Sequence, residues 1–166
     1  MDFLVKTKAL NLTLEEISSE IKVLNGEFDN VKLDYFVITL YGEFEKNLDY
    51  IIENKISLKN NFGLNYIDFI KNKDHKLHRG ITKEQFKNLL EKVFNKKILS
   101  IVDNTEWNIF ISFLDFRHAI AHLLPSYQQK KEALILQMKT QKNLLNVADK
   151  ILKQLDSINR IKRVTA

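Results

Sequence analysis

The sequence predicts an all-α fold that forms one domain. Of its 166 residues, 45% are hydrophobic and 28% charged, which is typical of a globular protein with a sizeable core. One proline and four glycines leave few positions that would interrupt a helix. Apolar residues recur at spacings of three and four, the period of an amphipathic helix. No repeat, linker or low-complexity segment divides the chain, so we expect a single domain over residues 1–166.

Two helices are predicted in the first third of the chain. The first covers about residues 13–28, where Thr13 and Glu16 match a capping box. The second covers residues 30–56, with Asn30 as its N-cap. Apolar residues surround much of this second helix, so we expect it to be central.

The middle of the chain is less regular. A short helix is expected over about residues 64–71, followed by a basic loop that ends at Gly80. Another helix should begin at Thr82, because Thr82 and Gln85 match a capping box.

Two further helices complete the prediction. One begins near Thr105 and must end or bend close to Pro125, because a residue before proline avoids helical dihedral angles. The last is a long basic helix over about residues 126–162. The apolar stripes assign Trp107, Phe110, Ile111, Leu114 and Ala121 to one face of the first, and Leu134, Met138, Leu145, Ala148, Leu152 and Leu155 to one face of the second.

Charge and composition exclude several classes of protein. The chain has no cysteine, which rules out disulfides, thiolate catalysis and cysteine-ligated metal sites. No signal peptide is evident and no apolar run approaches the roughly 20 residues that span a bilayer, so we expect a cytoplasmic protein with no membrane partner. Residues 130–163 hold nine basic side chains and three acidic ones, against a net charge of +5 for the whole chain. Such a run favours either a nucleic-acid contact or an ordinary solvated helix face.

One mostly apolar stretch contains three ionisable residues. It reads NIFISFLDFRHAIAHLLP, residues 108–125, and includes Arg117, His118 and His122. Such side chains are seldom placed among apolar residues unless they have partners or a function. These three are therefore the candidate functional residues.

A metal site is the first chemistry to consider. The four histidines form two pairs, His75 with His78 and His118 with His122, and two histidines four residues apart on a helix can share a zinc ion. Arg117 adjoins the second pair, however, and its charge repels a divalent cation. No carboxylate follows at ligand spacing, so we expect neither a metal nor a cofactor.

Two interpretations of Arg117 and His122 remain open. Cations near a helix C-terminus are favoured by the macrodipole and can bond the last free carbonyls, which would be a structural role. Alternatively, an arginine and a histidine about one turn apart can act as a catalytic pair. The histidine would transfer protons near neutral pH, and the arginine would stabilise charge on a phosphoryl group. That pair suits cleavage of a phosphodiester by its own 2′-hydroxyl.

The motif and its surroundings resemble a known family. RHAIAH, residues 117–122, resembles the R-x4-6-H motif of HEPN domains in its four-residue-spacer form, and a polar residue such as His118 often follows the arginine there. LDYFVITLYGEFEKNLDYI resembles the central helix of the stand-alone RiboL-PSP type branch, and EWNIFISFLDFRHAIAH resembles its motif-bearing helix. The resemblance covers roughly residues 31–56 and 105–160.

The resemblance implies a HEPN-like up-and-down helical bundle with a long C-terminal helix, which dimerises and places two motifs around a shared cleft. Many members are metal-independent endoribonucleases of toxin–antitoxin or anti-phage defence systems, so RNA is the implied substrate and a cognate antitoxin an implied partner. Arg117 and His122 would be the catalytic pair, and His118 would orient them or contact RNA. Glu43 or Glu45 would pair with Arg117.

The chemistry gives its own reason for a homodimer. Acid–base cleavage needs one group to accept a proton and another to donate one, and a two-fold axis supplies two copies of His122. The alternative is a non-catalytic HEPN module that binds RNA or protein. One branch carries a modifiable tyrosine two residues after the motif histidine. This chain has Leu124 there and its next tyrosine is Tyr127, which argues against such a modification.

Overall fold

The computed structural model describes residues 30–57, 61–71, 80–140 and 144–164, and within these ranges every regular element is a helix. The all-α prediction is therefore confirmed. The helix expected over residues 13–28 lies outside the described residues. The elements are α2 (Asn30–Ser57), α3 (Asn61–Lys71), α4 (Lys83–Lys92), the 3-10 turn η3 (Ile98–Ser100), α5 (Asn104–Ala121), α6 (Tyr127–Thr140) and α7 (Leu144–Asp156).

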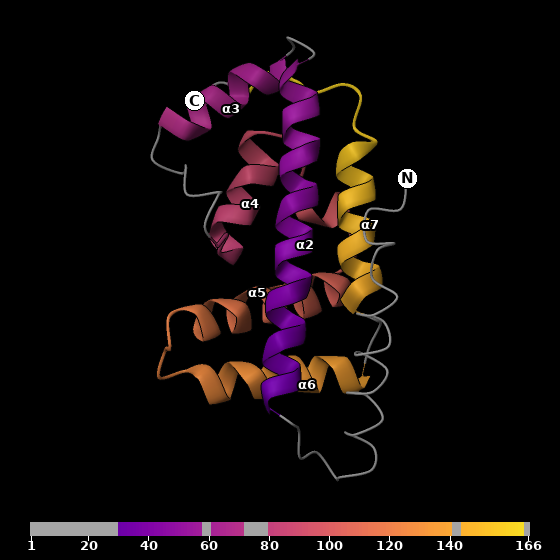
Figure 1. The fold of residues 1–166 in the computed structure, drawn as a ribbon. Coiled ribbons are helices and arrows are strands. Elements are labelled where there is room, and N and C mark those ends of the chain that lie inside the picture. The colour runs from indigo at the N-terminus through magenta and orange to yellow at the C-terminus, as the bar shows by residue number, and fades with distance from the viewer. Residues whose placement is uncertain (1–29, 58–60, 72–79, 141–143, 165–166) are drawn as a thin grey trace.

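Helix α2 is the axis of the molecule, as its apolar circumference predicts. Helices α3, α5 and α7 all pack against it. Figure 1 shows α7 running beside the upper half of α2, while α5 and α6 form an antiparallel pair that crosses its lower half. The crossing pair differs from the parallel alignment of a simple up-and-down bundle.

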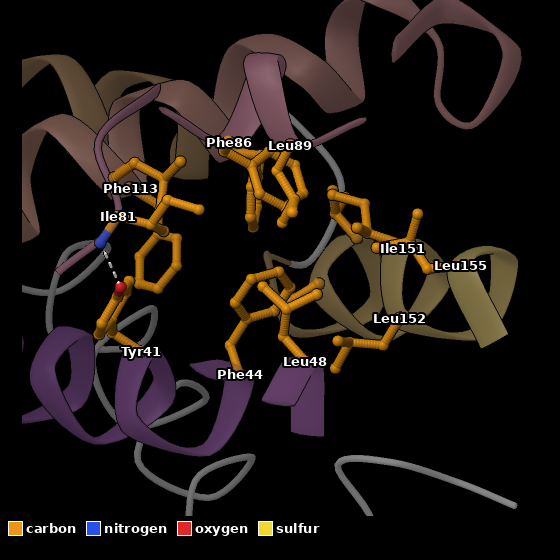
Figure 2. Close-up of a cluster of buried hydrophobic side chains, with 14 of the residues drawn as sticks. Tyr41, Phe44, Leu48, Ile81, Phe86, Leu89, Phe113, Ile151, Leu152 and Leu155 are labelled. Carbon is orange, nitrogen blue, oxygen red and sulfur yellow. Dashed lines mark hydrogen bonds between the residues drawn. The ribbon is translucent and has the colours of Figure 1, made fainter. Parts of the chain in front are cut away.

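A cluster of aromatic rings joins α2, α4 and α5. Phe44, Phe86 and Phe110 are fully buried, and their ring centroids lie 5.1 to 5.9 Å apart. At these separations the tilted and edge-on rings add pair energy to the burial of their apolar surface. Leu48 of α2 and Leu152 of α7 extend the same core (Figure 2).

Helix α5 is buried on more than one face. Phe110 and Leu114 belong to the predicted stripe and are buried, but so are Ile109, Phe113 and Phe116. Contacts with α2 and α4 as well as with α6 and α7 explain this burial. Ala121 is exposed because it lies in the last turn, so the predicted single face is wrong at that residue.

The predicted long C-terminal helix over residues 126–162 is wrong in its continuity. Two helices, α6 and α7, take its place and run in clearly different directions (Figure 1). The apolar stripe itself is confirmed, because Leu134, Leu145, Ala148, Leu152 and Leu155 are buried and Met138 is half-buried. The α6 part of the stripe therefore packs against α5, and the α7 part packs against α2.

The helix also ends earlier than predicted, at Asp156. The Nζ of Lys55 on α2 donates to the backbone oxygens of Asp156 and Ile158, at 3.0 and 2.8 Å. Residues beyond that point are held by α3. The Asn65 side chain donates to Lys162 O at 2.9 Å and accepts from Val164 N at 2.8 Å.

No helix among the described residues is long and apolar enough to cross a membrane.

Candidate functional site

The motif lies at the C-terminal end of α5, and both ends of this helix are well defined. At the start, the Asp103 side chain accepts from Glu106 N and the Glu106 side chain accepts from Asp103 N, which forms a capping box. Glu106 is buried and pairs with Lys150 of α7 at 2.8 Å. These contacts fix the register of the helix that presents Arg117, His118 and His122.

The last turn of α5 is capped by its own backbone. Leu123 adopts a left-handed conformation (φ 49°), and His122 before it has φ −108° and ψ 6°. The pattern is a Schellman motif, in which backbone N–H groups satisfy the last carbonyls. The bonds run from His122 N to His118 O (3.1 Å), from Leu123 N to Ile120 O (3.4 Å) and from Leu124 N to Ala119 O (3.1 Å).

The Schellman motif weighs against the interpretation of Arg117 and His122 as capping residues. The carbonyls of His118, Ala119 and Ile120 are already taken by backbone donors, so these three do not require capping by the Arg117 or His122 side chain. Leu123 is 89% exposed and occupies a conformation that usually favours glycine. The strained residue Leu123 directly follows His122 in the chain.

The two histidines form a pair. Their ring centroids lie 4.5 Å apart with the planes tilted by 56°, as expected for residues one turn apart on one face. His122 is exposed, whereas His118 is half-buried and its buried Nδ1 has no hydrogen-bond partner within the described residues. Burial, followed by the charges of His122 and Arg117, lowers the pKa of His118 below 6.5, and Asp115 opposes this shift. The neutral form of His118 is therefore favoured near pH 7.

Arg117 points away from this pair and into the protein. Its Cζ lies 4.1 Å from the centroid of the Tyr41 ring, a cation–π geometry. On another side is Gly80, which has φ 104°. A Cβ at Gly80 would overlap Nη1 and would stand only 2.8 Å from Cζ, so the guanidinium fits because this residue has no side chain. We call the space between Tyr41 and Gly80 the arginine slot.

The slot is held by hydrogen bonds from the segment before α4. The Tyr41 hydroxyl accepts from Ile81 N at 2.6 Å, a bond drawn in Figure 2, and donates to Glu45 at 3.5 Å. Glu45 also accepts from Gly80 N at 3.5 Å. Burial is the largest of the causes that raise the pKa of Tyr41 to about 12, so its hydroxyl stays protonated. Arg117 Nη1 is buried, and no hydrogen-bond partner for it is found among the described residues.

Glu43 and Glu45, the predicted carboxylate partners of Arg117, have different surroundings. Glu45 belongs to the slot through Tyr41 and Gly80, but no ion pair joins it to Arg117 among the described residues. For Glu43 the hydrogen bond found is at its backbone oxygen, which accepts from the Asn47 side chain at 2.7 Å, and no ion pair joins its carboxylate to Arg117 within the described ranges. No contact between Arg117 and His122 is found in the described part of the chain, so His118 is the residue next to both.

Tyr127 has a structural position. Its hydroxyl lies 2.8 Å from both carboxylate oxygens of Asp34 and so ties the start of α6 to α2. Burial and this hydrogen bond raise its pKa to about 12.

The basic run over residues 130–163 does not form a continuous free stripe. Several of its cations pair with carboxylates of other turns or helices, and Lys131 is buried. Such pairing favours the interpretation as an ordinary helix surface over most of the run. The pairs are Lys130–Asp115 (3.5 Å), Lys150–Glu106 (2.8 Å), Lys153–Asp149 (2.7 Å) and Arg163–Asp68 (2.6 Å).

The described residues contain no group of three or more His, Cys, Asp or Glu side chains arranged to hold a metal ion. His75 and His78 lie outside them.

Sequence reasoning missed two members of the site, Tyr41 and Gly80. Tyr41 looks like one more apolar-face residue of α2, and Gly80 like the end of a loop. The glycine itself was the one available signal in the sequence. Glycine tolerates a positive φ and so permits a turn, but it does not show which side chain packs against that turn.

The site is thus defined by this chain's own residues. Arg117 lies in the arginine slot, and His118 and His122 pair at the end of the same helix. Scans against protein-family models, curated proteins and solved structures find no significant match to this chain, so its chemistry has to be argued from this arrangement and from the RHAIAH motif.

Proposed function

We propose that the chain is a metal-independent endoribonuclease of HEPN type. The observation that carries the proposal is the pair of imidazoles at the end of α5, with Arg117 held in the arginine slot from the same end of that helix. His122 is exposed where a substrate can reach it, and a buried donor of Arg117 has no partner in the part of the chain that the structure describes. The RHAIAH resemblance supplies the reaction class.

The proposed reaction is an intramolecular transesterification. One imidazole removes the proton of the RNA 2′-hydroxyl, and that oxygen attacks the adjacent phosphorus. The bond from phosphorus to the 5′-oxygen breaks, and a second, protonated imidazole donates a proton to the leaving oxygen. The products are a 2′,3′-cyclic phosphate and a 5′-hydroxyl, while the Arg117 guanidinium stabilises charge on the non-bridging oxygens.

The two imidazoles come from a homodimer in this proposal. His122 of each copy faces a shared cleft, so one acts as base and the other as acid. His118 contacts the His122 ring and orients it. A cytoplasmic toxin or anti-phage defence protein, controlled by a cognate antitoxin protein, is the setting that the family resemblance suggests.

The test is cleavage of a structured RNA in excess EDTA. We expect His122→Ala and Arg117→Ala each to lower the rate by about 100-fold or more. Gln129→Ala, at an exposed position of α6, is the control and should retain the rate. Specific activity should rise with protein concentration across the range in which sedimentation detects dimer formation. Equal cleavage by wild type and His122→Ala would disprove the catalytic role.

A non-catalytic module that binds RNA or protein is the second candidate. The burial of the Arg117 guanidinium against Tyr41 favours it, because an arginine held in this way also stabilises packing. This candidate predicts RNA binding without cleavage, together with a large loss of thermal stability in Arg117→Ala. Unchanged cleavage products across all variants would instead indicate a contaminating nuclease.

A further inference from the structure

A cavity lies far from the motif, where the segment between α4 and α5 meets the residues that follow α7. Its volume is about 330 Å³. Ile101, which lines it, precedes the first turn of α5, whereas the motif lies in the last turn. At 1.5 Å per residue, the part of α5 from Asn104 to Arg117 separates the two by roughly 20 Å. The cavity is therefore a separate site.

The lining of this cavity is cationic. Lys96 comes from the segment between α4 and α5 and Arg160 from the residues after α7, and the lining residues include no acid. Lys150, Lys153 and Arg163 have carboxylate partners, whereas within the described residues no ion pair involves Lys96 or Arg160. Two like charges from segments more than sixty residues apart are thus brought to one concavity without compensation.

The C-terminal end of α7, which adjoins the cavity, does not supply the negative charge that would balance Lys96 and Arg160. The last carbonyls of a helix carry partial negative charge that attracts cations and repels anions. Here the Nζ of Lys55 already donates hydrogen bonds to the backbone oxygens of Asp156 and Ile158. That contact leaves the charge of Arg160 available to a ligand.

We propose that this cavity binds a phosphate group carried by a nucleotide unit. Lys96 and Arg160 hold the phosphate oxygens, and the side-chain amides of Gln154 and Asn159 offer further donors. Ile158, which is half-buried, provides apolar surface for a base or ribose. The volume lies at the lower end of the range of small-ligand pockets and suits one nucleotide unit.

The inference is independent of cleavage at the motif. The unit is either a free mononucleotide or one nucleotide of an RNA chain, and both present the same phosphate chemistry. A phosphate is favoured over a carboxylate because the arginine fork and the lysine point charge together can contact three oxygens.

The test is titration of the ¹⁵N-labelled full chain, followed by amide chemical shifts. The probes are uridine 5′-monophosphate and a 2′-O-methyl RNA octamer, which the proposed nuclease cannot cleave. Succinate is the carboxylate control. We expect saturable shifts at residues 96–101 and 154–160, and no comparable shifts with succinate.

The matched variants each remove two charges. Lys96→Gln/Arg160→Gln should weaken binding at least about tenfold. Lys46→Gln/Lys87→Gln, at exposed positions of α2 and α4, should change it less than twofold. Tighter binding of the octamer would identify RNA as the source, and equal or tighter binding of the mononucleotide would identify a free nucleotide. No saturable shifts with either probe, succinate binding as tight as theirs, or equal weakening in the two double variants would overturn the proposal.

Discussion

At the scale of single residues, the arginine slot decides what the motif can do. Tyr41 lies under the guanidinium, and Gly80 allows it to approach the backbone. An arginine fixed in this way has lost much of its rotamer freedom before any substrate arrives, so less entropy is lost on binding. The slot therefore preorganises the cation that the proposed reaction requires.

Gly80→Ala should destabilise the protein through Arg117. The new Cβ would overlap Nη1, and a φ of 104° is strained for alanine, so we expect a loss of about 1–3 kcal/mol in the free energy of unfolding. In an Arg117→Ala background the overlap is absent and the loss should be smaller. Urea denaturation of the four chains measures this coupling. Equal losses in both backgrounds would show that the glycine is required for its backbone conformation alone.

His118 should make stability depend on pH. Its folded pKa lies below its ordinary value of 6.5, so the unfolded chain takes up the proton first as the pH falls. The stabilising contribution is complete above about pH 6.5 and is lost as the pH falls through the folded pKa. We expect His118→Gln to flatten the decline in the free energy of unfolding between pH 7.5 and 5.5. If the free energy of unfolding of His118→Gln declined as steeply as that of wild type, titratable groups other than His118 would be the cause.

The sequence pointed to Arg117, His118 and His122 because an apolar run makes ionisable residues conspicuous. It could not show that Arg117 and the histidines face different surroundings. Helical positions five residues apart differ by about 140° around the axis, so Arg117 reaches the interior while His122 stays exposed. Tyr41 and Gly80 join the site through tertiary packing, which leaves no local pattern.

At the scale of elements, capping signals located helix starts, whereas the end of the last helix was predicted wrongly. The capping box of Thr82 and Gln85 is present as predicted. Asp103 and Glu106 form another, which moves the start of α5 to Asn104. Ends depend on distant partners. The apolar stripe of residues 126–162 is continuous, and the division into α6 and α7 follows from the two surfaces that they cover.

Lys55→Met tests the control of a helix end by another helix. Burial lowers the pKa of Lys55, and Asp156 opposes this shift. Its Nζ donates to the carbonyls of Asp156, the last residue of α7, and of Ile158 just beyond it, and the loss of these bonds should cost about 1.5–3 kcal/mol in the free energy of unfolding. Lys46→Met, at an exposed position of α2, is the control. Urea midpoints measure both, and an equal midpoint for the two variants would contradict the capping role.

At the scale of the whole molecule, the crossed arrangement separates two regions. The α5–α6 pair carries the motif at one end of α5, and the phosphate cavity that we propose lies beside the other end. Helix α2 contacts both α5 and α7, so the two regions share one rigid support. Composition and periodicity predicted the helical class and the central role of α2, but the crossing arises from side-chain packing that no periodicity encodes.

The bonds from Lys55 and Asn65 to residues about one hundred positions later have a consequence for biosynthesis. Helices α2 and α3 leave the ribosome long before their partners at residues 156–164 are made. Until then Lys55 must remain hydrated and the surface of α2 that α7 covers stays exposed. Native structure must therefore form late during synthesis, and the nascent chain presents an apolar surface to which chaperones can bind.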